Sequence, residues 1–98
     1  MTTKQHADRV IICQWHDKDS GRYGIEAFLP DEPANVGCIA CYATIGQHSE
    51  ASLEYYWGTR KVDYSTPEVK ALVNELISIG YNVRLMKRLA RPFGGWAK

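Results

Sequence analysis

Residues 9–29 read RVIICQWHDKDSGRYGIEAFL, so that two segments rich in apolar and β-branched side chains flank the polar cluster DKDSG. The first segment covers residues 9–16, and in the second, residues 22–29, apolar and polar side chains alternate. Alternation with a period of two is typical of a strand, and Asp, Ser and Gly are favoured in turns. The region therefore predicts an antiparallel β-hairpin with a five-residue loop.

Two further segments extend the hairpin into a sheet. Residues 38–45, CIACYATI, follow a loop with two prolines and are apolar enough for a central strand. Residues 82–88, NVRLMKR, predict a final strand that returns beside the sheet. A basic helical stripe is the alternative for this last region, because four cations stand at i, i+3, i+4 and i+7: Arg84, Lys87, Arg88 and Arg91.

Two segments have helical features. Residues 50–57, EASLEYYW, fit both helix and strand spacing, but Ser49 as N-cap and Gly58 as C-cap favour a two-turn helix. A longer helix is expected over residues 67–79, because Pro and Glu open it and a glycine follows it. Its apolar stripe consists of Val69, Leu72, Val73, Leu76 and Ile79.

These elements predict a single α+β domain over residues 1–98, with an antiparallel sheet of about four strands and the 67–79 helix packed on one face. Flexible ends are expected at about residues 1–8 and 92–98. The amino-terminal residues have no apolar signal-like region, and no apolar run is long enough to span a bilayer. With three cysteines, an odd number, we expect a cytoplasmic protein with reduced thiols and no membrane association.

Charge is distributed unevenly along the chain. Residues 1–58 hold four Lys or Arg against eight Asp or Glu, whereas residues 59–98 hold eight against three. No acidic residue follows Glu75, so the segment 81–98 carries only positive charge, interleaved with aromatic residues. Such a one-sign segment favours docking of a partner.

Four residues have the ligand types and pair spacings of a tetrahedral zinc site: Cys13, His16, Cys38 and Cys41. Both pairs lie in strand-like runs, where residues three apart are separated by roughly 10 Å and point to opposite faces. Buried structural cysteines are therefore the preferred interpretation, and a zinc-stabilised domain is a further alternative. We expect no cofactor.

Motifs of enzymes are absent from the sequence. It contains no phosphate-binding glycine loop, nucleophile elbow or metalloprotease motif. We therefore expect a non-enzymatic protein.

Residues 45–88, IGQHSEASLEYYWGTRKVDYSTPEVKALVNELISIGYNVRLMKR, resemble uncharacterised small proteins encoded by bacteriophages and other bacterial mobile elements. The shared features are a GQHS-like turn, a Tyr-rich segment, a Thr-Arg dipeptide, a Pro-Glu helix start and a final GYxxRx stretch. The resemblance implies a bacterial cytoplasm and a role in modulating a host or element protein. The resemblance does not indicate any particular catalytic activity.

A non-enzymatic protein-binding module is the leading functional prediction, with an unknown host protein or a second copy of the chain as partner. Aromatic residues and Arg are the types that anchor protein interfaces. The predicted partner-binding residues are Tyr55, Tyr56, Trp57, Arg60, Arg84 and Arg88.

Nucleic-acid binding is the alternative function. It would use the cations Arg60, Lys61, Arg84, Lys87, Arg88 and Arg91, with Phe93 or Trp96 stacking on bases. The same cations also suit a solvated strand edge that resists aggregation. The pI of about 7.7 is well below that of a dedicated nucleic-acid-binding domain.

Overall fold

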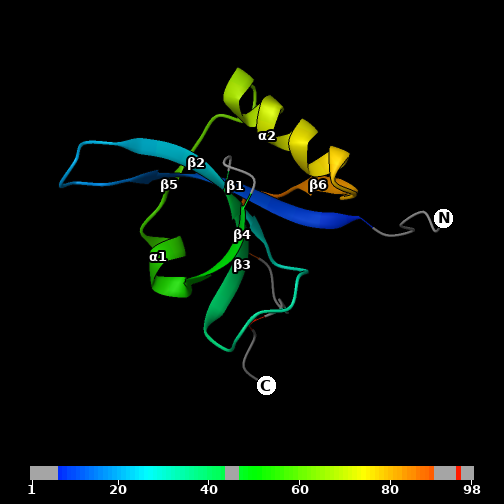
Figure 1. Cartoon of the computed structure of the whole chain (residues 1–98), viewed down its shortest axis with the longest axis horizontal. Coiled ribbons are helices and arrows are strands. Elements are labelled where there is room, and N and C mark those ends of the chain that lie inside the picture. Colours follow the sequence, from blue (N-terminus) through cyan, green and yellow to red (C-terminus); the bar gives the residue numbers. More distant parts are fainter. Residues whose placement is uncertain (1–6, 44–46, 90–94, 96–98) are drawn as a thin grey trace.

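The computed structural model describes residues 7–43, 47–89 and 95, which form a six-stranded sheet and two helices. The elements are β1 (Asp8–His16), β2 (Tyr23–Leu29), β3 (Cys38–Ala43), β4 (Gln47–Ser52), α1 (Leu53–Trp57), β5 (Arg60–Lys61), α2 (Pro67–Ser78) and β6 (Val83–Leu85). The strands lie in the order β4-β3-β2-β1-β5, and β6 also pairs with β1. Helix α2 lies on one side of the sheet and α1 on the other (Figure 1). The predicted α+β domain with one main helix is confirmed.

The β1–β2 hairpin has the antiparallel pairing that the alternation predicts, from Ile11 opposite Phe28 to His16 opposite Tyr23. In its loop the carboxylate of Asp17 accepts a hydrogen bond from the hydroxyl of Ser20 at 2.7 Å, and the backbone of Gly21 is left-handed, with φ of 72°. Glycine adopts this conformation without steric cost. Turn chemistry in the loop therefore supports the same register as the strands.

Apolar side chains fill both faces of the sheet, because successive residues of β1 point in opposite directions. On one face Val10 and Ile12 pack with the buried stripe of α2, which is Val69, Leu72 and Leu76. On the other face Ile11 and Cys13 pack with residues of β2, β3, α1 and the segment after β6: Phe28, Ile39, Cys41, Leu53, Tyr56, Met86 and Leu89. Burial of each large aliphatic side chain stabilises the fold by about 1.5–3 kcal/mol. Two-sided burial explains why residues 10–13 of β1 are apolar at four successive positions instead of alternating.

The structure divides residues 50–57 between a strand and a helix, so the predicted two-turn helix is too long. Residues up to Ser52 pair with β3, and only Leu53–Trp57 are helical. The N-cap is Ser52, whose hydroxyl accepts from the backbone N–H of Tyr55 at 3.1 Å, while the C-cap is Gly58 as expected. Ser49, the expected N-cap, lies inside β4 opposite Cys41. Pairing with β3 outweighs the capping potential of Ser49, and the sequence shows only the latter.

Helix α2 begins at Pro67 as predicted but ends at Ser78. Ile79 is 48 % exposed and does not belong to the buried stripe. The next residue, Gly80, has φ of 113° and turns the chain away from the helix axis.

The strand count is higher than predicted, because β4 and the two-residue β5 were not expected as strands. The final strand is also shorter than the 82–88 segment, and it pairs with β1 in parallel, from Asp8 opposite Val83 to Val10 opposite Leu85. Strand β5 runs antiparallel to β1, and α2 then takes the chain to the beginning of β1. The returning chain must therefore run in the same direction as β1, so the sheet is not wholly antiparallel.

Both expected flexible ends contain a residue with defined contacts. Asp8 is buried in β1, and its backbone N–H donates to the carbonyl of Asn82 at 2.8 Å. The carbonyl of Gly95 accepts from the N–H of Gly37 at 3.0 Å. Residues 1–6, 92–94 and 96–98 lie outside the described part of the chain. Among the described residues, no helix has the length and apolar character needed to cross a membrane.

Candidate binding edge and cavity

The outer edge of β1 is shared by two strands that do not meet. Strand β5 pairs with Cys13 and Gln14, and β6 pairs with residues 8–10. Between these pairings, the backbone N–H of Ile12 donates to the hydroxyl of Tyr64 at 3.1 Å. A side chain thus takes the place of a strand at this point.

Tyr64 also joins the two flanking segments. Its hydroxyl donates to the carbonyl of Met86 at 2.6 Å, and the Met86 N–H donates to the carbonyl of Val10 at 2.8 Å. Burial raises the pKa of Tyr64 above its ordinary value, so the phenol stays protonated and keeps its donor at neutral pH. The residue therefore connects β1 to the segment after β6 across the gap in the edge.

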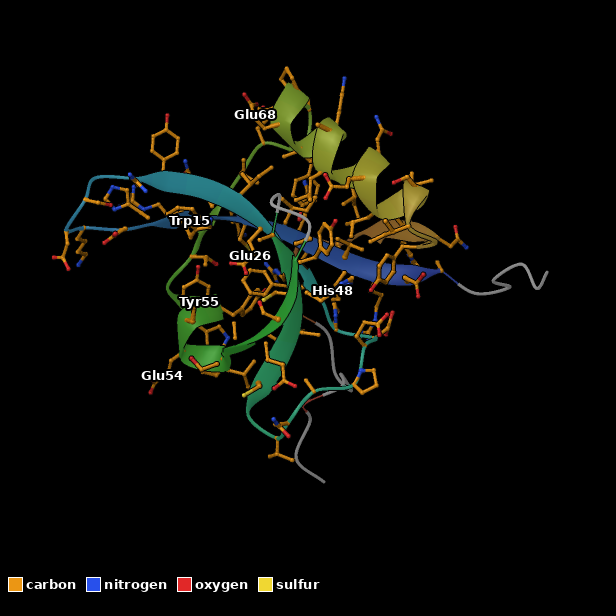
Figure 2. All side chains as sticks on the ribbon, viewed as in Figure 1. Trp15, Glu26, His48, Glu54, Tyr55 and Glu68 are labelled. Atoms are coloured by element: carbon orange, nitrogen blue, oxygen red, sulfur yellow. The ribbon has the colours of Figure 1, made fainter. Side chains whose placement is uncertain are left out.

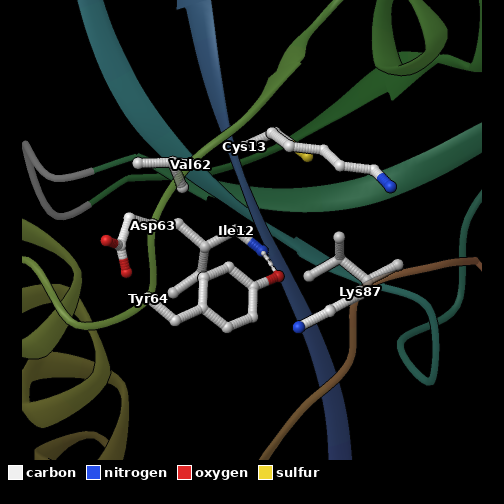
Figure 3. Close-up of a pocket in the computed structure, with 8 residues that line it drawn as sticks. Ile12, Cys13, Val62, Asp63, Tyr64 and Lys87 are labelled. Atoms are coloured by element: carbon white, nitrogen blue, oxygen red, sulfur yellow. Dashed lines mark hydrogen bonds between the residues drawn. The ribbon is translucent and has the colours of Figure 1, made fainter.

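A cavity of about 360 Å³ opens at this gap, and we call it the edge cavity (Figure 3). Its apolar lining comes from β1 and the residue after β5: Ile11, Ile12, Cys13 and Val62. The ring of Tyr64 and three charged side chains, Lys61, Asp63 and Lys87, complete it. Figure 3 shows the Lys87 side chain extending toward Tyr64. The cavity lining therefore combines apolar side chains with two lysines and one carboxylate.

Five exposed cations follow the same edge, and we call them the basic edge: Arg60, Lys61, Arg84, Lys87 and Arg88. They come from two segments separated by α2. The pairing of β5 and β6 with β1 places both segments along its outer edge, with Lys87 and Arg88 just after β6. None of the five has an ion-pair partner among the described residues. Arg91, also predicted for this surface, lies outside the described part of the chain.

Asp63 is the acidic residue of the edge cavity, but its charge has local partners. Its carboxylate accepts hydrogen bonds from the backbone N–H and the hydroxyl of Ser65, at 2.9 and 2.7 Å. These hydrogen bonds hold the pKa of Asp63 below its ordinary value. The carboxylate therefore has hydrogen-bond partners within its own turn, before the start of α2, and stays ionised, so the cavity lining carries one negative charge beside the two lysines.

The three predicted aromatic residues of α1 have different environments. Tyr56 packs edge-on against Phe28, with ring centroids 4.9 Å apart, and belongs to the core. The hydroxyl of Tyr55 donates to the buried carboxylate of Glu26 at 3.1 Å, toward which it points in Figure 2. Trp57 is 66 % exposed. Of the three, Trp57 is the side chain most available to a partner.

The four proposed zinc ligands are not brought together. Cys13 and Cys41 are buried on the α1 face, His16 is exposed at the end of β1, and Cys38 begins β3. Among the residues that the structure describes, no three His, Cys, Asp or Glu side chains form a metal-binding group. Extended backbone separates each pair, as the strand geometry requires.

Burial also makes the two core thiols poor nucleophiles. It raises the pKa of Cys41 to about 11 and that of Cys13 above its ordinary value, so both remain thiols at neutral pH. Because the thiolate is the reactive form, neither side chain is suited to nucleophilic catalysis.

Acidic side chains lie at the opposite edge of the sheet, where β4 is the last strand. A shallow hollow there is lined by Glu32, Pro33, Ala40, His48, Ser49 and Glu50. The carboxylate of Glu50 accepts from the side-chain amide of Asn35 at 3.1 Å. Two acidic residues of the first 58, Glu32 and Glu50, therefore lie at the edge opposite the basic edge.

Sequence analysis did not find the role of Tyr64 or the existence of β5. Two residues are too few to show a strand period, and Tyr64 stands in a polar turn that has no periodicity. The clustering of cations after residue 59 was the available signal, and it indicated a basic surface but neither the shared edge of β1 nor the cavity.

Comparison with known proteins found no matching protein-family model, no similar curated protein and no similar solved structure. The resemblance of residues 45–88 to small phage and mobile-element proteins therefore stays a prediction.

Proposed function

We propose that this protein is a non-catalytic binding module that docks its basic edge onto an acidic surface of a partner protein. The observation that carries the proposal is the gathering of Arg60, Lys61, Arg84, Lys87 and Arg88 on one edge of β1. Unneutralised cations at one edge accelerate association with an acidic surface and orient it. Trp57, exposed at the end of α1 and three residues before Arg60, supplies an aromatic anchor of the type enriched in interfaces.

A protein partner suits this surface better than a nucleic acid. Nucleic-acid affinity rests on many phosphate contacts, and the basic edge offers five cations for them. Phe93 and Trp96, the residues predicted to stack on bases, lie outside the described part of the chain. The cavity within the edge has an apolar floor, which suits a side chain more than a phosphate.

The predicted biological setting forms part of this proposal. A small binding module is suited to occupying the surface of another protein and changing its activity. The resemblance to phage and mobile-element proteins favours a regulator or inhibitor of a host protein in a bacterial cytoplasm.

The test is an affinity pull-down from a bacterial lysate with nuclease treatment, comparing the wild type with matched charge-reversal variants. The edge variant is Arg84→Glu plus Arg88→Glu. The control is Arg22→Glu plus Lys70→Glu, which reverses the same number of exposed charges on the hairpin loop and on α2. Circular dichroism confirms that both variants fold.

We expect one protein to be retained after nuclease treatment by the wild type and the control variant, and lost by the edge variant. Equal capture by the edge variant would contradict docking through the basic edge. Capture that disappears with nuclease treatment would indicate that the basic edge binds nucleic acid instead of a protein. Capture of the chain by itself, with a dimer in sedimentation analysis, would identify a second copy as the partner.

A further inference from the structure

We propose that the edge cavity is a binding pocket for a small organic carboxylate, that is, an apolar body ending in one carboxylate group. This inference goes beyond docking of a partner protein, because the pocket lies within the chain and requires no second macromolecule. It concerns the space between β5, Tyr64 and the segment after β6.

The volume and lining of the cavity suit a small ligand. Its volume of about 360 Å³ lies in the range of ligand-binding pockets, roughly 300–1,000 Å³. Such pockets are lined mainly by apolar groups, with a few polar groups that orient the ligand. Ile12, Cys13 and Val62 supply the apolar part here.

The two lysines determine the charge of the ligand. Lys61 and Lys87 line the cavity from β5 and from the segment after β6, and neither has an ion-pair partner in the described ranges. Asp63, which also lines the cavity, is hydrogen-bonded to Ser65 and keeps its negative charge, so the lining carries two positive charges and one negative charge. A carboxylate that reaches either ammonium group would gain a charge-assisted hydrogen bond, which is stronger than a neutral one.

Tyr64 keeps the cavity in shape. Its hydroxyl is held by the backbone of Ile12 and by the carbonyl of Met86, at 3.1 and 2.6 Å, so the ring stands as a fixed wall between the two segments. A preformed wall lowers the entropy cost of binding. The apolar body of the ligand would pack beside this ring while its carboxylate faces Lys87, whose side chain extends toward Tyr64 in Figure 3.

The experiment is a titration with phenylacetate followed by two-dimensional ¹H–¹⁵N NMR, with phenylacetamide as a neutral probe of the same shape. We expect phenylacetate to shift amide signals of residues 11–13, 61–64 and 87. We expect phenylacetamide to bind about tenfold more weakly, a change that corresponds to about 1.4 kcal/mol.

Matched variants test the role of the lysines. Lys61→Gln plus Lys87→Gln should weaken phenylacetate binding about tenfold and leave phenylacetamide binding unchanged. Lys70→Gln, an exposed change on α2, should leave both unchanged. All three side chains are exposed, and the dispersion of the NMR spectrum reports whether each variant is folded.

Three results would overturn the proposal. The first is equal binding of phenylacetate and phenylacetamide, and the second is equal affinity of the double variant and the wild type for phenylacetate. The third is the absence of amide shifts, or shifts only outside the cavity, at 20 mM phenylacetate, a concentration that would detect a Kd of roughly millimolar. Failure of the pull-down would leave this titration unaffected, so the two proposals fail separately.

The natural carboxylate has two possible sources, a free small molecule or the carboxyl terminus of a protein chain. A peptide of five residues ending in Phe, compared in its free and amidated forms, distinguishes them. Binding of the free form that exceeds phenylacetate binding identifies a chain end. If the cavity binds phenylacetate but not the peptide, the natural ligand is a free small molecule.

Discussion

Replacement of Tyr64 by Phe tests whether one hydroxyl holds the split edge of β1 together. Tyr64→Phe keeps the ring in the cavity wall but removes the acceptor of the Ile12 N–H and the donor to the Met86 carbonyl. Each lost hydrogen bond costs about 0.5–1.5 kcal/mol net, which places the whole loss at about 2 kcal/mol.

The magnitude can be measured by chemical and thermal unfolding. For a domain of this size, a loss of 1 kcal/mol lowers Tm by roughly 4–8 °C, so we expect a fall of about 8–16 °C. Hydrogen exchange provides a local readout, because the Ile12 amide should lose protection more than other amides of β1. The matched control is Tyr23→Phe, at an exposed position of β2, with an expected change within about 0.5 kcal/mol.

The reasoning would be refuted by a Tyr64→Phe variant whose unfolding free energy lies within about 0.5 kcal/mol of the wild type and whose Ile12 amide keeps its protection. In that case the hydroxyl would not join β1 to the segment after β6. The fixed wall that we assign to the edge cavity would then also lose its support.

Two further predictions concern the carboxyl-terminal contact and alkaline pH. Gly95→Ala should destabilise the fold by about 1–3 kcal/mol in urea unfolding, because a Cβ there would lie 1.8 Å from the carbonyl oxygen of Cys38. The control is Gly58→Ala, where a Cβ would have its nearest contacts at 3.5 Å, and it should change stability by less than about 0.5 kcal/mol. Burial raises the pKa of Tyr55 and of Tyr81 to about 12, so the folded state keeps protons that the unfolded state loses above its ordinary tyrosine pKa. The resulting stability is complete below about pH 10 and is lost as the pH rises through about 12. Unfolding measured at successive pH values should show this decline, and Tyr55→Phe should make it shallower; an unchanged slope in the variant would contradict the assignment to Tyr55.

Elements with a strong local pattern were predictable from the sequence. The alternation and turn residues of residues 9–29 specify a hairpin, and the apolar stripe behind Pro67 specifies α2, because both signals lie within a few neighbouring residues. The boundary within residues 50–57 was not predictable. Its strand half depends on pairing with β3, and its helix half on the cap at Ser52.

The candidate site was predictable only as a set of charges. Arg60 and Arg84 are both evident in the sequence as members of a basic half, but nothing local indicates that they flank the same strand. Tyr56 is of a residue type that is common in interfaces, yet its ring packs against Phe28 in the core. The sequence thus gives the chemical type of each side chain, whereas its exposure depends on the residues that it contacts in the folded protein.

Local order in the chain therefore accounts for the hairpin, the main helix, the separation of acidic and basic residues and the absence of known enzyme motifs. These properties depend on residue type and short-range spacing, which a linear sequence contains in full. The shared edge of β1, the bridging of Ile12 and Met86 by Tyr64, the cavity beside them and the dispersal of the cysteines arose only in the folded molecule. They depend on contacts between residues that are distant along the chain, and such contacts form only when the whole sheet is assembled.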